Sequence, residues 1–96
     1  MKSDLLDVLG NPALQEGLLI LTRARPEIGL ALQVVSSLIR GWSEKAELNA
    51  AVVAINSRAA EHVKRLALGG LSSFERTEVE VRLHELLSVL IKLGEL

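Results

Sequence analysis

The stretch from Pro26 to Trp42 is apolar around almost its whole circumference when it is drawn as a helix. Its polar residues fall on one narrow stripe, and the other directions are occupied by Ile28, Leu30, Ala31, Leu32, Val34, Val35, Leu38 and Ile39. A helix of this kind is covered on most sides, in a core or at a subunit contact. The rest of the chain is therefore expected to pack around this stretch.

Apolar residues recur at helical spacing along the whole chain, and hydrophobic residues make up 49% of its 96 positions. One Phe, one Trp and no Tyr leave an aliphatic core, which is typical of helical bundles. The one alternating run, Thr77 to Leu83, sits inside a longer heptad pattern. The sequence predicts an all-α fold: a single domain over residues 1–96, a bundle of about four to five helices ending in a long antiparallel hairpin, completed by self-association.

The first part of the chain carries two helix start signals. A short helix over Asp4 to Leu9 is expected to end at Gly10, and Asn11 followed by Pro12 begins the next one. The apolar register then continues past Pro26, with Arg25 in the vacant core position. Pro26 either begins a new helix or kinks a continuous one, and we favour two segments, roughly 12–24 and 27–40.

Gly41 is a plausible C-cap for the stretch described above, with Ser43 beginning the next helix. No Gly or Pro interrupts Ser43 to Leu68, so about 26 residues at 1.5 Å each would span nearly 40 Å. That length exceeds the expected width of a domain of this size. A stripe of small side chains on this helix favours close helix packing: Ala46, Ala50, Val53, Ser57, Ala60 and Ala67.

The clearest boundary lies at Gly69 and Gly70, which end the long helix. Ser72 and Glu75 have the spacing of a capping box for the last helix, expected from about 73 to 93. A connection this short predicts that the last two helices lie antiparallel.

Charge and composition disfavour several classes of protein. The net charge of −1 gives no basic block for nucleic acid, and the absence of Cys removes disulfides and thiolate sites. The longest charge-free apolar run, 28–39, is too short for a membrane span of about 20 residues. Asp4 and Asp7 interrupt the region where a signal peptide would be apolar, so we expect a cytoplasmic protein without membrane attachment.

Few residues are candidates for catalysis or for metal binding. Glu61, His62, Glu80 and His84 could be drawn as a metal site, but Glu61 and His62 diverge by about 100° on a helix and cannot readily share one ion. No serine has a neighbouring base, and the paired glycines lack the strand and lysine of a phosphate loop. We expect no catalytic residue, no metal and no cofactor, and hence no enzyme.

The sequence favours a non-enzymatic interaction or assembly module, adaptor or structural, that forms a homo-oligomer, preferably a dimer, and binds a further protein. The expected interface residues are Leu32, Val35, Ile39, Trp42, Val79, Leu83, Leu86 and Leu90. The alternative is a small regulator that binds nucleic acid through a basic patch of Arg58, Lys64 and Arg65. Glu61 interrupts that patch, so nucleic acid is the weaker expectation.

Overall fold

Five α-helices and one short 3-10 turn make up the computed structural model, which describes residues 4–45 and 50–95. The elements are α1 (Asp4–Leu9), η1 (Pro12–Leu14), α2 (Gln15–Ala24), α3 (Pro26–Lys45), α4 (Ala50–Leu68) and α5 (Ser73–Glu95). No strand occurs in these two ranges. The predicted all-α class is confirmed.

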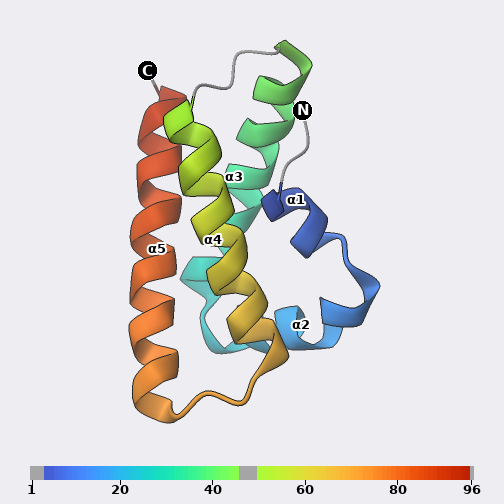
Figure 1. Cartoon of the computed structure of the whole chain (residues 1–96), viewed down its shortest axis with the longest axis vertical. Helices are drawn as coiled ribbons and strands as arrows, with labels where there is room; N and C mark the ends of the chain where they lie inside the picture. The colour runs from blue at the N-terminus through green and yellow to red at the C-terminus, as the bar shows by residue number, and fades with distance from the viewer. Residues whose placement is uncertain (1–3, 46–49, 96) are drawn as a thin grey trace.

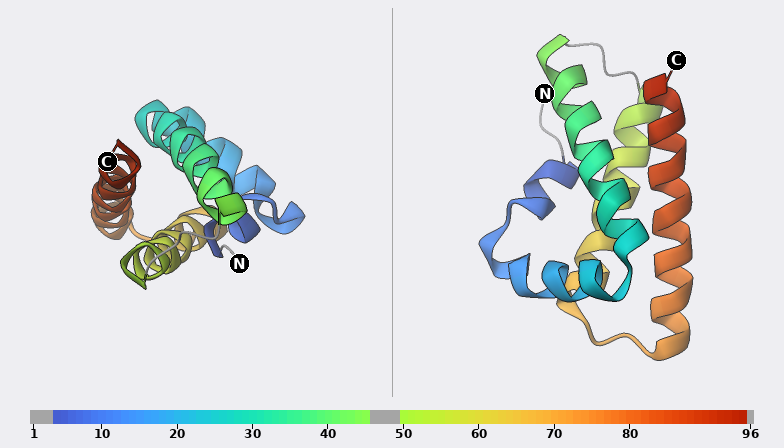
Figure 2. Two further views of the ribbon diagram at one scale, coloured as in Figure 1. Left: turned by 90° about the horizontal axis from the view of Figure 1, so that it is seen from above. Right: turned by 180° about the vertical axis from the view of Figure 1, so that it is seen from behind.

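The three long helices α3, α4 and α5 run along the longest axis of the molecule, and α1 and α2 lie to one side (Figures 1 and 2). α5 packs against both α3 and α4, while α2 packs against the same two helices near one end of the molecule. α4 and α5 run in opposite directions and are joined by a short connection (Figure 1). The core lies between these elements and holds buried side chains from all five helices and η1.

The α2–α3 boundary follows the local sequence. Arg25 leaves the helical region, with φ −133° and ψ 79°, and Pro26 opens α3 at the first helical position. The carbonyl of Arg25 accepts hydrogen bonds from the amides of Ile28 and Gly29 at 3.0 and 3.2 Å. Pro26 therefore starts a helix instead of kinking one, as the favoured alternative predicted.

The α4–α5 boundary also has the predicted chemistry. Gly69 and Gly70 have positive φ values of 75° and 80°, which glycine adopts without a steric penalty. The hydroxyl of Ser72 accepts a hydrogen bond from the amide of Glu75, and the carboxylate of Glu75 accepts one from the amide of Ser72, at 3.2 and 3.4 Å. The capping box is confirmed.

The prediction that Gly41 ends α3 is wrong. α3 continues to Lys45, so Ser43 lies in α3 and does not begin the next helix; residues 46–49, including Ala46 of the small stripe, are outside the described ranges. Gly41 is not among the described glycines with positive φ, which a left-handed C-cap requires. Trp42 packs against the core, and this contact favours continuation of the helix over a stop at a tolerated glycine.

The placement of Gly41 gives a direct test. A Cβ added at Gly41 would meet no atom within 4 Å, so Gly41→Ala should raise the free energy of unfolding by about 0.5–1 kcal/mol through helix propensity. Urea denaturation measures this change. Gly69→Ala is the control and should instead destabilise by about 1 kcal/mol, because an L side chain is strained at positive φ.

The small stripe on α4 is only partly covered. Ala60 is buried and Ala67 is half-buried against α2, whereas Ala50 and Val53 are exposed. The expectation of close packing thus holds at the carboxyl end of α4 and is corrected at its beginning, where none of the described helices covers Ala50 and Val53.

A buried asparagine attaches α1 to α4. Leu5 is fully buried, and its amide donates a hydrogen bond to Oδ1 of Asn56 at 3.0 Å. The first amides of a helix have no partner inside the helix, so a side chain of another helix can satisfy one of them. Asn56 therefore positions α1 on α4, a role that helical periodicity alone does not predict.

Candidate functional site

The eight predicted interface residues lie in or beside the core of the single chain. Six are buried, Leu32, Val35, Ile39, Val79, Leu83 and Leu90, and Trp42 and Leu86 are half-buried against the same core. A side chain covered by its own chain has little surface left for a partner. These residues lie in or beside the core of one chain, and their role at an interface stays a prediction, because periodicity identifies an apolar face without telling what covers it.

The length of the last helix does not require a second chain. α5 has 23 residues, or about 35 Å of helix, and the molecule measures 38 × 25 × 20 Å. A long helix therefore fits along the long axis of one chain. The apolar residues on more than one side of α5 likewise pack against α3 and α4 of the same chain.

Nine large apolar side chains nevertheless remain exposed in the described part of the chain. They are Leu19, Ile20, Leu30, Val34, Val53, Leu68, Phe74, Val81 and Val89. Phe74 is 79% exposed and Val81 is 53% exposed, one heptad apart on the outward side of α5. Together with Thr77, Glu78, Arg82 and Glu85 they line a shallow groove of about 380 Å³, which we call the α5 groove.

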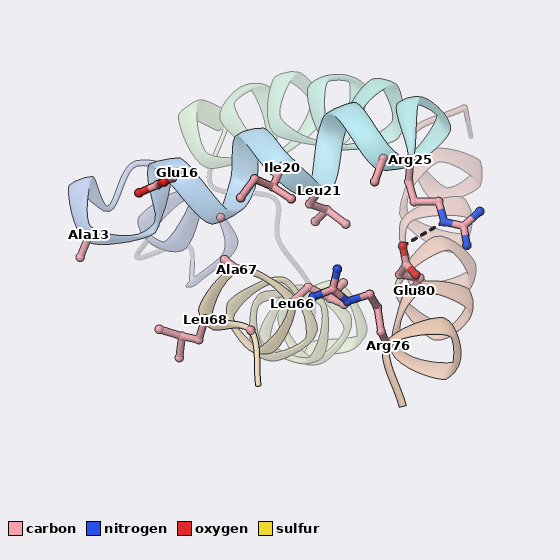
Figure 3. Close-up of a pocket in the computed structure, with 13 residues that line it drawn as sticks. Ala13, Glu16, Ile20, Leu21, Arg25, Leu66, Ala67, Leu68, Arg76 and Glu80 are labelled. Atoms are coloured by element: carbon pink, nitrogen blue, oxygen red, sulfur yellow. Dashed lines mark hydrogen bonds and ion pairs between the residues drawn. The ribbon is translucent and has the colours of Figure 1, made fainter. Parts of the chain in front are cut away.

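A larger pocket of about 560 Å³ opens between α2, the end of α4 and the beginning of α5. We call it the α2–α4–α5 pocket. Figure 3 shows α2 on one side, α4 on the other and α5 across one end. Its apolar lining includes Ile20, Leu21, Leu66 and Leu68, and its charged lining includes Glu16, Arg25, Arg76 and Glu80. The pocket therefore combines an apolar wall with several charged groups.

An ion pair closes one end of this pocket. The Nε of Arg25 donates to Oε2 of Glu80 at 3.0 Å, and the two side chains are 46% and 7% exposed (Figure 3). Glu80 lies among the inward-facing residues of α5, so its carboxylate needs a partner. In the sequence, this pair was indicated only by Arg25, which occupies a core position of the apolar register just before Pro26. No feature of the sequence near Glu80 identified it as the partner.

The predicted basic patch is on the surface of α4. Arg58, Lys64 and Arg65 are exposed, and Arg65 lines a hollow of about 170 Å³ together with His62 and with Glu75, Glu78, Val79 and Arg82 of α5. Glu78 pairs with Arg82 at 2.8 Å. The acidic beginning of α5 therefore does lie beside Arg65, although Glu80 belongs to the ion pair with Arg25.

The pKa of His62 is lowered from its ordinary value of 6.5, first by burial and then by the nearby charges of Arg65 and Arg82. Arg58 lowers it further, while Glu61 raises it. Its Nδ1 is buried without a hydrogen-bond partner in the described residues. Protonation of His62 is therefore disfavoured in the folded chain.

This lowered pKa predicts a pH dependence of stability. The unfolded chain takes up a proton at His62 near pH 6.5 and the folded chain only at lower pH, so stability falls as the pH drops below 6.5 and through the folded pKa. We expect the wild type to lose more free energy of unfolding between pH 7.5 and 5.5 than His62→Gln does, measured in urea. His84→Gln, at the other and exposed histidine, is the control and should follow the wild type.

Glu61, His62, Glu80 and His84, considered above as a metal site, do not come together as one. No group of three or more His, Cys, Asp or Glu side chains that could hold a metal ion occurs within residues 4–45 and 50–95. Glu80 is engaged with Arg25, and His62 faces the hollow beside Arg65. In the same ranges, no helix has the length and apolar character needed to cross a membrane.

Comparisons of the chain with protein-family models, with curated proteins and with solved structures gave no significant match.

Proposed function

We propose that this chain is a non-enzymatic helical interaction module that assembles with a second copy of itself and serves as an adaptor or structural unit. The observation that carries the proposal is the outward side of α5, where Phe74 and Val81 are exposed and line one groove. Exposed large apolar residues that lie close together mark interaction surfaces. The expected cytoplasmic location is part of this proposal.

The charges around the α5 groove favour a second copy as the partner. Glu78, Arg82 and Glu85 are the charged residues that line the groove, and Glu78 is paired with Arg82 at 2.8 Å. With both signs present and a net charge of −1, this surface repels its own copy only weakly. A two-fold contact brings the same surface from both chains together, and each Phe74 would be covered by the partner's α5.

The oligomeric state tests this proposal. We expect light scattering at micromolar concentration to give twice the chain mass of 10.4 kDa. Phe74→Glu combined with Val81→Glu should yield the single-chain mass with unchanged helical circular dichroism, because a buried charge opposes association. Leu30→Glu, at an exposed apolar residue on α3, is the matched control and should leave the dimer intact. A single-chain mass for the wild type at high micromolar concentration would contradict the proposal.

The alternative function is a small nucleic-acid-associated regulator. The observation that favours it is the gathering of positive charge near His62, where Arg82 of α5 joins Arg58 and Arg65. Glu78 and Glu75 line the same hollow and reduce its net charge, so the interaction module is the better supported function. A mobility-shift assay at about 150 mM salt separates the two, since weak surface attraction is screened there. Submicromolar binding that Arg58→Glu with Arg65→Glu abolishes would favour the regulator.

A further inference from the structure

The two ends of the α2–α4–α5 pocket differ in charge. At the α5 end, Arg76 extends from α5 toward the space between α2 and α4, and both Arg76 and Leu66 line the pocket (Figure 3). This side chain has no hydrogen-bond or ion-pair partner among residues 4–45 and 50–95, whereas Arg25 is paired with Glu80. Two guanidinium groups and one carboxylate leave a single positive charge at this end.

Between Arg76 and Glu16 the pocket is lined mainly by apolar side chains. Ile20 of α2 and Leu68 of α4 are 55% and 65% exposed at its walls, and Leu66 and Leu21 are buried in its lining. Glu16 is the charged residue at the opposite end, distant from Arg76 in Figure 3. A second negative charge at the far end of a ligand would therefore be repelled by Glu16. A bulky dianion at the Arg76 end would be repelled by Glu80.

We propose that this pocket binds a small monocarboxylate with an unbranched apolar tail. The carboxylate is held by the guanidinium of Arg76, whose planar donors match two carboxylate oxygens. The tail lies along Leu66 between Ile20 and Leu68 and covers their exposed surface. The pocket volume of about 560 Å³ falls in the range of small-molecule sites, about 300–1,000 Å³.

This site is separate from the proposed self-association surface. Neither Phe74 nor Val81 lines the pocket, and Arg76 does not line the α5 groove. Ligand binding and dimer formation can therefore be tested independently.

The glycine amides give a direct readout of binding. Gly17 and Gly69 line the pocket, whereas Gly10, Gly29, Gly41 and Gly94 do not. We expect titration of ¹⁵N-labelled protein with sodium octanoate to shift the amide signals of Gly17 and Gly69 in a saturable way and to leave the other four nearly unchanged. 1-Octanol has the same tail without the carboxylate and should bind at least about tenfold more weakly, because hydrogen bonds between charged groups are the stronger ones.

Two variants at Arg76, with Arg82→Gln as the control, test the role of this arginine. Arg76→Gln should weaken octanoate binding by about tenfold or more, since it removes the charged donor but keeps a shorter polar side chain. Arg82→Gln removes an exposed arginine six residues further along α5, outside the pocket, and should bind octanoate as the wild type does. The amide signals of residues outside the pocket verify that each variant is folded. Arg76→Lys keeps the charge without the planar donors and should bind octanoate with intermediate affinity.

Several results would overturn the inference. Absence of saturable shifts at Gly17 and Gly69 would show that octanoate does not occupy the pocket. Equal shifts at Gly17, at Gly69 and at the four glycines chosen as references would indicate unspecific association with the apolar surface. Equal binding of octanoate and 1-octanol, or unchanged binding by a folded Arg76→Gln protein, would show that Arg76 does not hold a carboxylate.

Discussion

Replacement of Arg25 by methionine should lower the free energy of unfolding by about 2–3 kcal/mol, although the arginine is nearly half exposed. The reason is its partner: the carboxylate of Glu80 is almost completely buried and would lose the donor at 3.0 Å. The loss is smaller than the roughly 3–5 kcal/mol for fully buried pairs because water can reach part of the site. Thermal unfolding should shift down by roughly 10–20 °C.

A second substitution separates the ion pair from simple packing. If the loss comes from an unpaired carboxylate, Arg25→Met combined with Glu80→Leu should recover most of the stability, because an apolar pair can replace a buried ion pair. Arg82→Met is the matched control: its pair with Glu78 is shorter, at 2.8 Å, but exposed on both sides, and should contribute less than about 1 kcal/mol. Equal losses for Arg25→Met and Arg82→Met would contradict the role given to burial.

Gly17→Ala should destabilise the chain by about 2 kcal/mol, even though alanine favours helices over glycine. A Cβ at Gly17 would overlap the carbonyl oxygen of Ala67 and lie 2.7 Å from its carbonyl carbon. These are backbone atoms of α4 and cannot rotate away, so α2 would have to move as a whole. The missing Cβ thus sets the distance between α2 and α4 and shapes the α2–α4–α5 pocket.

Gly41→Ala provides the comparison for Gly17→Ala, since the same methyl group is added to a helix with open space around it. The two variants should differ in free energy of unfolding by about 2–3 kcal/mol, with opposite signs relative to the wild type. Urea denaturation of both proteins measures the difference. Equal stability of the Gly17→Ala protein and the wild type would show that α2 and α4 do not approach this closely.

Several helix boundaries could be predicted from residues close together in the sequence. Pro26 begins α3 because its ring is compatible with the first helical turn but not with the interior of α2. Gly69 and Gly70 adopt positive φ, and Ser72 and Glu75 cap α5 through groups only three residues apart. Such signals depend on backbone sterics and hydrogen bonds within a few residues, so they could be read before any packing was known.

Other features depended on contacts between distant residues. Leu83 and Val35 lie on predicted apolar faces, but only the fold decides that helices of the same chain cover them. Arg25 occupied a core position in the sequence, yet its partner Glu80 lies 55 residues away. The placement of Arg76 and Leu66 in one pocket likewise requires α4 and α5 to pack together.

By itself, the sequence determined the helical class of this protein and the boundaries at Pro26 and at Gly69 to Ser72, because hydrophobic period and backbone preference are local properties. The tertiary structure decided that α3 continues through Gly41, that Phe74 and Val81 stay exposed while Leu83 is covered, and that charged and apolar residues of α2, α4 and α5 line one pocket. These outcomes depend on which surfaces meet, and that is set by non-local packing of side chains and not by the pattern along any single helix.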